Sequence, residues 1–381
     1  MKFQISGFKV SRFWFIYFVV RLFYLLFSVL VFPTLTTFGD PIHYMTSGIP
    51  FPFTSSTDLM RFLGGILGSV LGGFNVVSNF PFMLLSFGLI KWAVDILDIR
   101  NLIDDKILLI ILSLPTFCIW TSVCSKECIG LFFSAILGIL IVHYLNGNFK
   151  IHFRDYVAFS LCLFFKPQYL PFIVSTLFYL RFAFGLHSRR RLIILSVFYV
   201  SAIIFVLYLS RDLIDLYSLG VQKAFEFDSQ FSNSTRDTLF FVNKYDYFSK
   251  APMGIFIAFW GPTLTEALQK PFQMAVYIES FVVLCVFIYF LKTPLKKLIV
   301  NGIVNLRLIV SYSILFLGIL LVHYPFGVFN AGSATRYRTN YLFLFIILLM
   351  YLFSYYRNPK SNGRRTWLSS QLLGCIHRPL F

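Results

Sequence analysis

The stretch Ile107–Leu145, ILLIILSLPTFCIWTSVCSKECIGLFFSAILGILIVHYL, carries a Lys126-Glu127 pair inside an otherwise apolar run. A bilayer core of about 30 Å is crossed by about 20 helical residues, so the run is too long for one membrane span. It predicts two helices joined by a turn near Trp120–Glu127. The charged pair is then expected at a membrane surface rather than at mid-depth.

The composition of the whole chain indicates the same class of protein. Of 381 residues, 58% are hydrophobic, 20% are aromatic and only 13% are charged, and the mean hydropathy is +0.77. Soluble domains have about 25% charged residues. The sequence therefore predicts an all-α integral membrane protein with about ten transmembrane helices and outward-facing amphipathic loop helices. The expected spans are 13–32, 76–94, 107–120, 128–145, 156–165, 169–186, 192–210, 272–291, 308–325 and 340–356.

The formal net charge is +17. In a membrane protein the positions of Lys and Arg indicate which loops are cytoplasmic, so this charge does not lead us to expect nucleic acid as a partner. Lys and Arg concentrate in alternate connections between the spans. Those connections are predicted to be cytoplasmic, which also makes both termini cytoplasmic. The basic connections include Arg100 and Lys106, Lys150 and Arg154, Arg181 and Arg189–Arg191, Lys292 to Arg307, and the residues from Arg357 onward.

Residues 1–356 are expected to form a single polytopic membrane domain with large external loops at 33–75 and 211–271. Residues 357–381 are predicted to be a basic cytoplasmic tail. The first apolar segment contains Arg21 and lacks a small-residue cleavage site, so it is interpreted as a retained anchor. The six cysteines show no secreted disulfide spacing and no zinc-site spacing.

Charged and polar side chains gather on the predicted outer side, and most of them follow the end of an apolar run. A pocket at that boundary with a carboxylate and several cations suits a substrate that has an acyl tail in the lipid and a phosphate at the surface. The cations would stabilise a departing phosphate, and the carboxylate would take a proton from a sugar hydroxyl. The candidates are Asp40 with His43, the Lys126-Glu127 pair, Lys166, and Arg336 with Arg338.

Structural explanations remain open for most of these residues. Asp40 precedes a proline and suits a turn, and Glu127 suits the first turn of a helix. Lys166 and Arg338 are also explained as anchors at span ends. Arg336 differs from these residues, because few basic residues are expected outside and its neighbours are small and polar, a setting suited to phosphate oxygens. Asp40 remains the first candidate for the catalytic base. Arg21 within a span is a second-rank candidate.

Five features follow one another along the chain. They are Asp40 in the first external loop, P-x4-W-T-S-x2-S-K-E (115–127), K-P-x-Y-L-P (166–171), G-P-x3-E (261–266) and N-x-G-S-x2-R-Y-R (330–338). Their order resembles that of bacterial membrane glycosyltransferases of the GT-C kind and of polytopic O-antigen and capsule polymerases. The resemblance is one of layout over most of residues 1–356.

The resemblance implies an enzyme of the bacterial cytoplasmic membrane that builds surface polysaccharide of the cell envelope. Its donor would be a saccharide linked to a polyprenyl phosphate such as undecaprenyl phosphate, and its other partners would be membrane lipid and further polysaccharide-assembly proteins. Asp40 would be the catalytic base, and basic residues would contact the lipid phosphate. His43 and Glu127 are expected to line the same substrate site. No D-D or D-x-D pair stands near Asp40, and His143 and His323 lie at opposite ends of their spans, so neither a metal nor a cofactor is expected.

Two other functions remain open from the sequence. A flippase or transporter of lipid-linked oligosaccharide would bind its substrate near the middle of the membrane, often in repeated halves with discontinuous helices. The sequence shows no internal repeat. A membrane scaffold without chemistry would leave the external arginines without a ligand.

Overall fold

The structure is a computed structural model that describes residues 2–5, 8–36, 38–51, 54–228, 235–236, 239–269, 271–301 and 305–357. The described chain is a multi-pass helical membrane protein. Seven of its helices are long and apolar enough to cross a bilayer, and an eighth span results if one bent helix pair is counted as a span. The seven are Arg12–Leu35, Val76–Ile96, Lys126–Leu145, Arg189–Leu209, Gln273–Val300, Leu306–Val328 and Ala331–Arg357.

The elements follow one another in a simple order along the chain. They are β1 (Lys2–Ile5), β2 (Phe8–Ser11), α1 (Arg12–Leu26), η1 (Phe27–Val31), α2 (Phe32–Leu35), α3 (Asp40–Thr46), α4 (Ser56–Leu71), α5 (Val76–Ile96), η2 (Ile99–Asn101), α6 (Asp105–Leu112), α7 (Pro115–Thr121), α8 (Lys126–Leu145), α9 (Phe153–Phe165), η3 (Pro167–Tyr169), α10 (Leu170–Phe184), α11 (Arg189–Leu209), α12 (Arg211–Asp228), α13 (Asp246–Ser249), α14 (Ala251–Trp260), α15 (Leu264–Gln269), α16 (Pro271–Asn301), α17 (Leu306–Val328) and α18 (Ala331–Arg357).

Three of the ten predicted spans differ from simple membrane helices. The segment 107–120 is divided between α6 and α7, with a break before Pro115, which starts α7. The segments 156–165 and 169–186 correspond to α9 and α10. The chain bends by 116° between these two helices, at a break that contains Lys166. Proline at both breaks explains them, since it has no amide hydrogen to donate and favours the first helical position.

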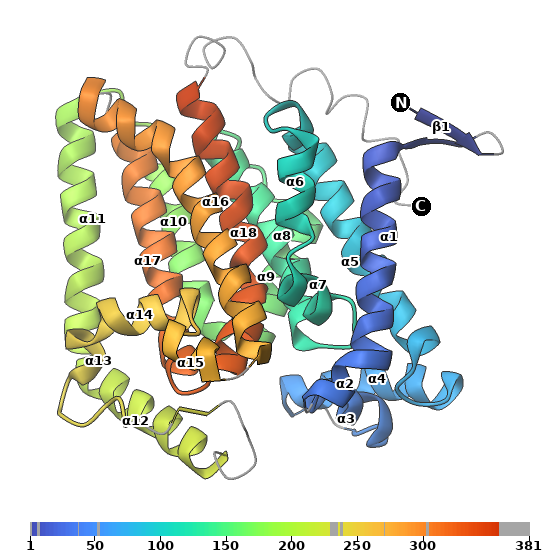
Figure 1. Cartoon of the computed structure of the whole chain (residues 1–381). Helices are drawn as coiled ribbons and strands as arrows, with labels where there is room; N and C mark the ends of the chain where they lie inside the picture. Colours follow the sequence, from blue (N-terminus) through green and yellow to red (C-terminus); the bar gives the residue numbers. More distant parts are fainter. Residues whose placement is uncertain are drawn as a thin grey trace.

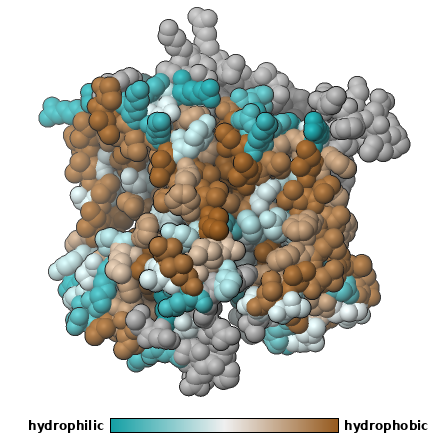
Figure 2. Space-filling model, viewed as in Figure 1, coloured by the Kyte–Doolittle hydropathy of each residue, from teal (hydrophilic) through white to brown (hydrophobic). Residues whose placement is uncertain are grey.

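The membrane helices run roughly parallel, and the helices α3, α4 and α12–α15 gather at one end of the bundle (Figure 1). We call the end with α3, α4 and α12–α15 the loop end, and the opposite end the terminal end. The terminal end is where α1 begins and α18 ends (Figure 1). A broad apolar band lies between hydrophilic edges (Figure 2), as expected for a bilayer-embedded surface. The basic tail predicted from residue 357 lies outside the described residues from 358 onward.

The helices α8 and α18 form the centre of the bundle, and both are mostly buried, whereas α11 is almost wholly exposed at its edge. Close approach of α8 to α18 requires a glycine. A Cβ atom at Gly130 would lie 2.2 Å from Oδ1 of Asn340. This packing fixes the start of α8 beside the first turns of α18.

The short helix α3 is held in a similar way against α4. A Cβ atom at Gly68 of α4 would lie 2.2 Å from the carbonyl oxygen of Met45. Gly64 likewise lies against the backbone of Tyr44 and the Sγ atom of Cys124, which precedes α8. The glycines of α4 therefore hold α3, with Asp40 at its first position, closely against α4, and Gly64 also places α4 beside Cys124, just before α8.

Candidate functional site

The guanidinium of Arg336 joins two carboxylates that come from distant parts of the chain. Its Nη2 atom lies 2.7 Å from Oδ2 of Asp40, and its Nε atom donates to Oε1 of Glu127 at 3.0 Å. Asp40 begins α3, Glu127 is in the first turn of α8, and Arg336 lies near the start of α18. One side chain thus connects three elements at the loop end.

Two lysines complete a set of three cations around these carboxylates. Lys166 is at the break between α9 and α10, is almost fully buried, and has its Nζ atom 4.3 Å from the centre of the Tyr337 ring. Lys126 donates to Oγ1 of Thr57 at 2.8 Å. Within the described residues, neither ammonium has a carboxylate oxygen within 4.0 Å. The set of Asp40, Lys126, Glu127, Lys166 and Arg336, here called the charged cluster, therefore carries one more positive than negative charge.

Aromatic rings hold the cations of the charged cluster in place. The guanidinium of Arg336 lies 4.8 Å from the centre of the Trp120 ring and 5.7 Å from that of Tyr337. Trp120 in turn contacts Phe38, two residues before Asp40, with 5.1 Å between ring centres. Cation–aromatic contacts of this kind are worth about 0.5–2 kcal/mol, more when the cation is desolvated. The rings therefore favour one orientation of Arg336.

Asp40 remains ionised to lower pH than an ordinary aspartate. Burial alone raises its pKa, but the charge of Arg336 and its hydrogen bond, with smaller contributions from Lys126 and Tyr44, outweigh burial and lower the pKa overall. Burial, followed by the charge of Asp40, raises the pKa of Tyr44, so that its hydroxyl remains a protonated donor. The carboxylate of Asp40 is about half exposed and is open to a ligand.

Glu127 has the opposite environment, because its side chain is fully buried. One carboxylate oxygen pairs with Arg336, and the other, Oε2, has no hydrogen-bond partner among the described residues. A buried acceptor without a donor costs about 1–3 kcal/mol. A ligand hydroxyl or an ordered water that donates to Oε2 would recover this free energy.

The helix α7, which carries Trp120 and leads into Lys126-Glu127, has a buried charge at each end. The carboxylate of Glu279 on α16 accepts from the backbone N of Thr116 at 2.7 Å, in the first turn of α7. Arg21 on α1 donates to the carbonyl oxygen of Thr121 at 2.9 Å, in the last turn. A negative charge at the N-terminus and a positive charge at the C-terminus both favour the helix dipole. The position of Trp120 is therefore fixed from both ends of α7.

The charge of Glu279 is itself balanced within the bundle. Nη2 of Arg338 lies 3.0 Å from Oε1 of Glu279, and Nη1 donates to Oγ of Ser280 and to the carbonyl oxygen of Phe259. Arg338 is fully buried. It therefore belongs to the ion pair that supports α7 and not to the charged cluster.

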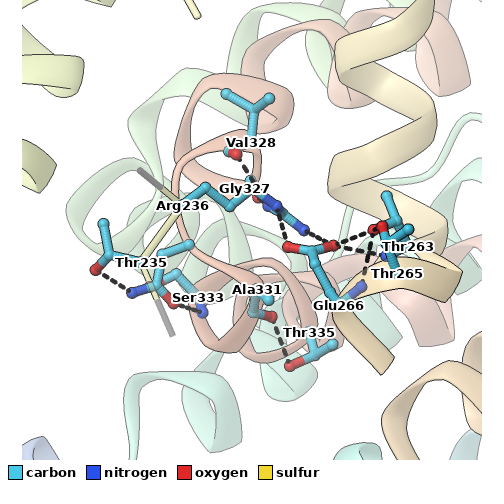
Figure 3. Close-up of polar contacts among 11 residues, drawn as sticks. Thr235, Arg236, Thr263, Thr265, Glu266, Gly327, Val328, Ala331, Ser333 and Thr335 are labelled. Carbon is cyan, nitrogen blue, oxygen red and sulfur yellow. Dashed lines mark hydrogen bonds and ion pairs between the residues drawn. The ribbon is translucent and has the colours of Figure 1, made fainter. Parts of the chain in front are cut away.

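A separate polar cluster fixes the start of α18 (Figure 3). Arg236 forms a two-pronged pair with Glu266, with Nε to Oε1 at 2.6 Å and Nη2 to Oε2 at 3.2 Å. Its Nη1 atom donates to the carbonyl oxygens of Gly327 and Val328, which end α17. Asn330 caps the first turn of α18 by accepting from the backbone N of Ser333. The turn that leads to Arg336 is thus tied to α15 and α17.

The structure brings together most of the residues that the sequence singled out. Asp40, Lys126, Glu127, Lys166 and Arg336 are close to one another through contacts with Arg336, Tyr337 and their neighbours. The expectation that Arg338 joins Arg336 at a phosphate is not supported by its position. Two residues apart on a helix means about 200° around the axis, so the two side chains point to different sides.

His43 also stays outside the charged cluster. Its side chain is exposed on α3, and no side-chain hydrogen bond of His43 is found within the described part of the chain. Arg21 binds Thr121 and Ser86 inside the bundle and supports α7 instead of facing a ligand. The described residues contain no group of three or more His, Cys, Asp or Glu side chains placed to hold a metal ion.

Sequence reasoning missed several residues that shape the site. Trp120 is part of the motif P-x4-W-T-S-x2-S-K-E, and Tyr44 follows Asp40 by one helical turn, but the sequence alone indicates no role for either. Glu279 had a clear signal, since it is a lone acid within the predicted span 272–291 and such residues are costly unless paired. Tyr337 had no signal beyond its place between Arg336 and Arg338.

The chemistry available at the charged cluster follows from these positions. Three cations near one another suit an anion with several oxygens, and the fork of Arg336 suits phosphate. The half-exposed carboxylate of Asp40 suits proton transfer, and Oε2 of Glu127 suits a hydroxyl donor. Comparison of the chain with protein-family models, with curated proteins and with solved structures gives no match.

Proposed function

We propose that this protein is a membrane glycosyltransferase or polymerase of the GT-C kind that uses polyprenyl-phosphate-linked sugar donors. In this proposal it acts at the outer face of the bacterial cytoplasmic membrane, in the assembly of O-antigen or capsule. The observation that carries the proposal is the charged cluster. It combines a phosphate-sized set of cations with an accessible carboxylate at the loop end of a membrane bundle.

The proposed reaction assigns a role to each member of the cluster. The acceptor hydroxyl attacks the anomeric carbon of the donor, the bond from that carbon to the phosphate oxygen breaks, and Asp40 takes the hydroxyl proton. Arg336, Lys126 and Lys166 stabilise the charge on the departing polyprenyl phosphate. Glu127 pairs with Arg336 through Oε1 and accepts a hydrogen bond from a sugar hydroxyl through Oε2.

The pairing of Asp40 with Arg336 gives the donor a means of activating the base. In the free protein the guanidinium lowers the pKa of Asp40, which makes the carboxylate a weak base. A phosphate that draws Arg336 toward itself weakens this pairing. The pKa of Asp40 then rises, and the carboxylate becomes a better proton acceptor when the donor is bound.

Proteoliposomes of the purified chain provide the direct test. With a polyprenyl-phosphate-linked saccharide and an acceptor present, the proposal expects free polyprenyl phosphate or pyrophosphate and a longer saccharide. Loss of the protein from its host should leave unextended lipid-linked units. Movement of intact lipid-linked saccharide across the membrane without release of the lipid phosphate would contradict the proposal.

One observation favours transport of lipid-linked oligosaccharide as a second candidate. The elements that carry Trp120 and Lys166, α6–α7 and α9–α10, are both discontinuous, and transporters build binding sites at such breaks. The half-exposed Asp40 at the loop end is better explained by chemistry at the membrane surface. The proteoliposome experiment distinguishes the two functions.

A further inference from the structure

Acidic residues are absent from two long stretches of the sequence. No Asp or Glu occurs between Tyr156 and Ser210 or between Ser280 and Phe381. These stretches supply α10, α11, α17, α18 and most of α16. Their basic residues at the terminal end consequently have no carboxylate from their own segments.

Contacts in the structure join these segments into one surface at the terminal end. Arg307, at the start of α17, donates to the carbonyl oxygen of Leu186 in the turn between α10 and α11, at 2.7 Å. Lys297 of α16 donates to the carbonyl oxygen of Tyr356 near the end of α18. The side-chain amide of Asn305 donates to the hydroxyl of Tyr355 at 2.6 Å, which connects α17 to α18. The result is a continuous basic edge, here defined as Arg189, Arg190, Arg191, Lys296, Lys297 and Arg307.

The other half of the terminal end differs in its charge pairing. There Lys91 pairs with Asp95 at 2.6 Å, and Arg100 pairs with Asp105 at 2.6 Å. Arg154 lies 3.7 Å from Asp155. In the basic edge, by contrast, the contacts of Arg307 and Lys297 go to backbone carbonyls. No member of the basic edge forms an ion pair with a carboxylate of the described residues.

Arg189–Arg191, three of the four arginines of the basic edge, lie next to a lipid-facing surface. Arg189–Arg191 are exposed in the first turn of α11, and α11 is almost wholly exposed along its length. Ile194 and Phe198, one and two turns further on, are 60% and 69% exposed. Apolar side chains of this exposure on a membrane helix face acyl chains, so the arginines are at headgroup level beside them.

We infer that the basic edge binds the headgroups of anionic phospholipids. The acyl chains then lie along the exposed face of α11, and the phosphates lie against Arg189–Arg191. A soluble acidic protein or a nucleic acid would match the charge but not the apolar surface that continues from it. Near a membrane, each arginine strengthens binding of an anionic lipid about fivefold, and three together about a hundredfold. This inference does not depend on the proposed catalytic function.

Native mass spectrometry of the full chain in a neutral detergent tests the inference. The protein is titrated with phosphatidylglycerol or phosphatidylcholine, and bound lipid is counted, with inorganic phosphate as a competitor. The test variant combines Arg189→Gln, Arg190→Gln and Arg191→Gln. The matched control combines Lys91→Gln, Arg100→Gln and Arg154→Gln, which removes the same charge from the acid-paired half.

The wild-type chain and the control should prefer phosphatidylglycerol over phosphatidylcholine, and the test variant should lose about a hundredfold of that preference. Inorganic phosphate at the lipid concentration should not displace the lipid. An equal loss of lipid preference in both variants would show that only net charge matters, and it would overturn the inference. An unchanged preference in the test variant would also overturn it. If the test variant does not fold, Arg→Lys at the same three positions should keep most of the preference, and its loss would also overturn the inference.

Discussion

The buried pair of Glu279 and Arg338 should be among the most sensitive points of the structure. Glu279→Gln removes the charge while keeping the size and an oxygen that can accept from Thr116. It leaves Arg338, which is 0% exposed, without a counter-charge. Loss of one partner from a buried ion pair costs about 3–5 kcal/mol of stability. The free energy of unfolding of Glu279→Gln should fall by about that amount.

Unfolding in mixed micelles with increasing SDS measures this change. The matched control is Lys91→Gln, which breaks a half-exposed pair with Asp95 and should cost less than about 1 kcal/mol. The double variant Glu279→Gln/Arg338→Met removes both charges and should recover much of the lost stability. Wild-type stability in Glu279→Gln, or a double variant that is no more stable than Glu279→Gln, would show that this buried ion pair does not stabilise the fold around α7.

Further predictions concern Arg336 and the contact between α8 and α18. The lysine in Arg336→Lys cannot bind Asp40 and Glu127 together. One charged hydrogen bond is worth about 1.5–3 kcal/mol, so activity should fall about 10- to 100-fold in the release assay. Full activity would show that the planar guanidinium is not needed. Arg336→Gln removes the charge that lowers the pKa of Asp40. The base form of Asp40 is then lost at a higher pH as the solution is acidified, so the acid limb of the pH–rate profile should move upward, and an unmoved limb would count against Asp40 as the base. Gly130→Ala forces a Cβ atom against Asn340 and should lower stability by about 1–3 kcal/mol in the same SDS titration, whereas Gly88→Ala, with open space around it, should cost far less.

The general architecture could be predicted from the sequence because length and hydropathy are direct consequences of the bilayer. The turn between 120 and 127 is where the structure has it, with α7 ending at Thr121 and α8 starting at Lys126. The breaks within 107–120 and around Lys166 could not be predicted from hydropathy. A half-helix held by buried charges and a complete span have similar compositions, and only the partners on other helices distinguish them.

The charged cluster was predictable for a different reason. Each of Asp40, Glu127 and Lys166 stands next to the end of an apolar run, and such ends meet at a membrane boundary. Arg336 and Arg338 precede the predicted span 340–356, and hydropathy does not reveal that α18 already begins at Ala331. The two arginines are therefore neighbours in the sequence but point to different sides of a helix in the structure. The ion pairs between distant residues could not be predicted either, because the pairing of Arg236 with Glu266, for example, depends on how the loop end folds.

The proposed function requires Asp40 to act as the base of a transfer reaction in the charged cluster. Asp40→Asn keeps the size of the side chain but cannot take a proton, and a positioned base contributes about 10²–10⁴-fold to such a step. The decisive measurement is the rate of polyprenyl phosphate release in proteoliposomes with equal amounts of folded protein. Asp58→Asn is the matched control, because Asp58 is an acid in the first turn of α4 that accepts hydrogen bonds from Thr54 and Ser55 and is not a member of the charged cluster. Asp40→Asn should lower this rate by about 10²–10⁴-fold, and Asp58→Asn should change it little. A wild-type rate in Asp40→Asn would contradict the role of Asp40 as the base.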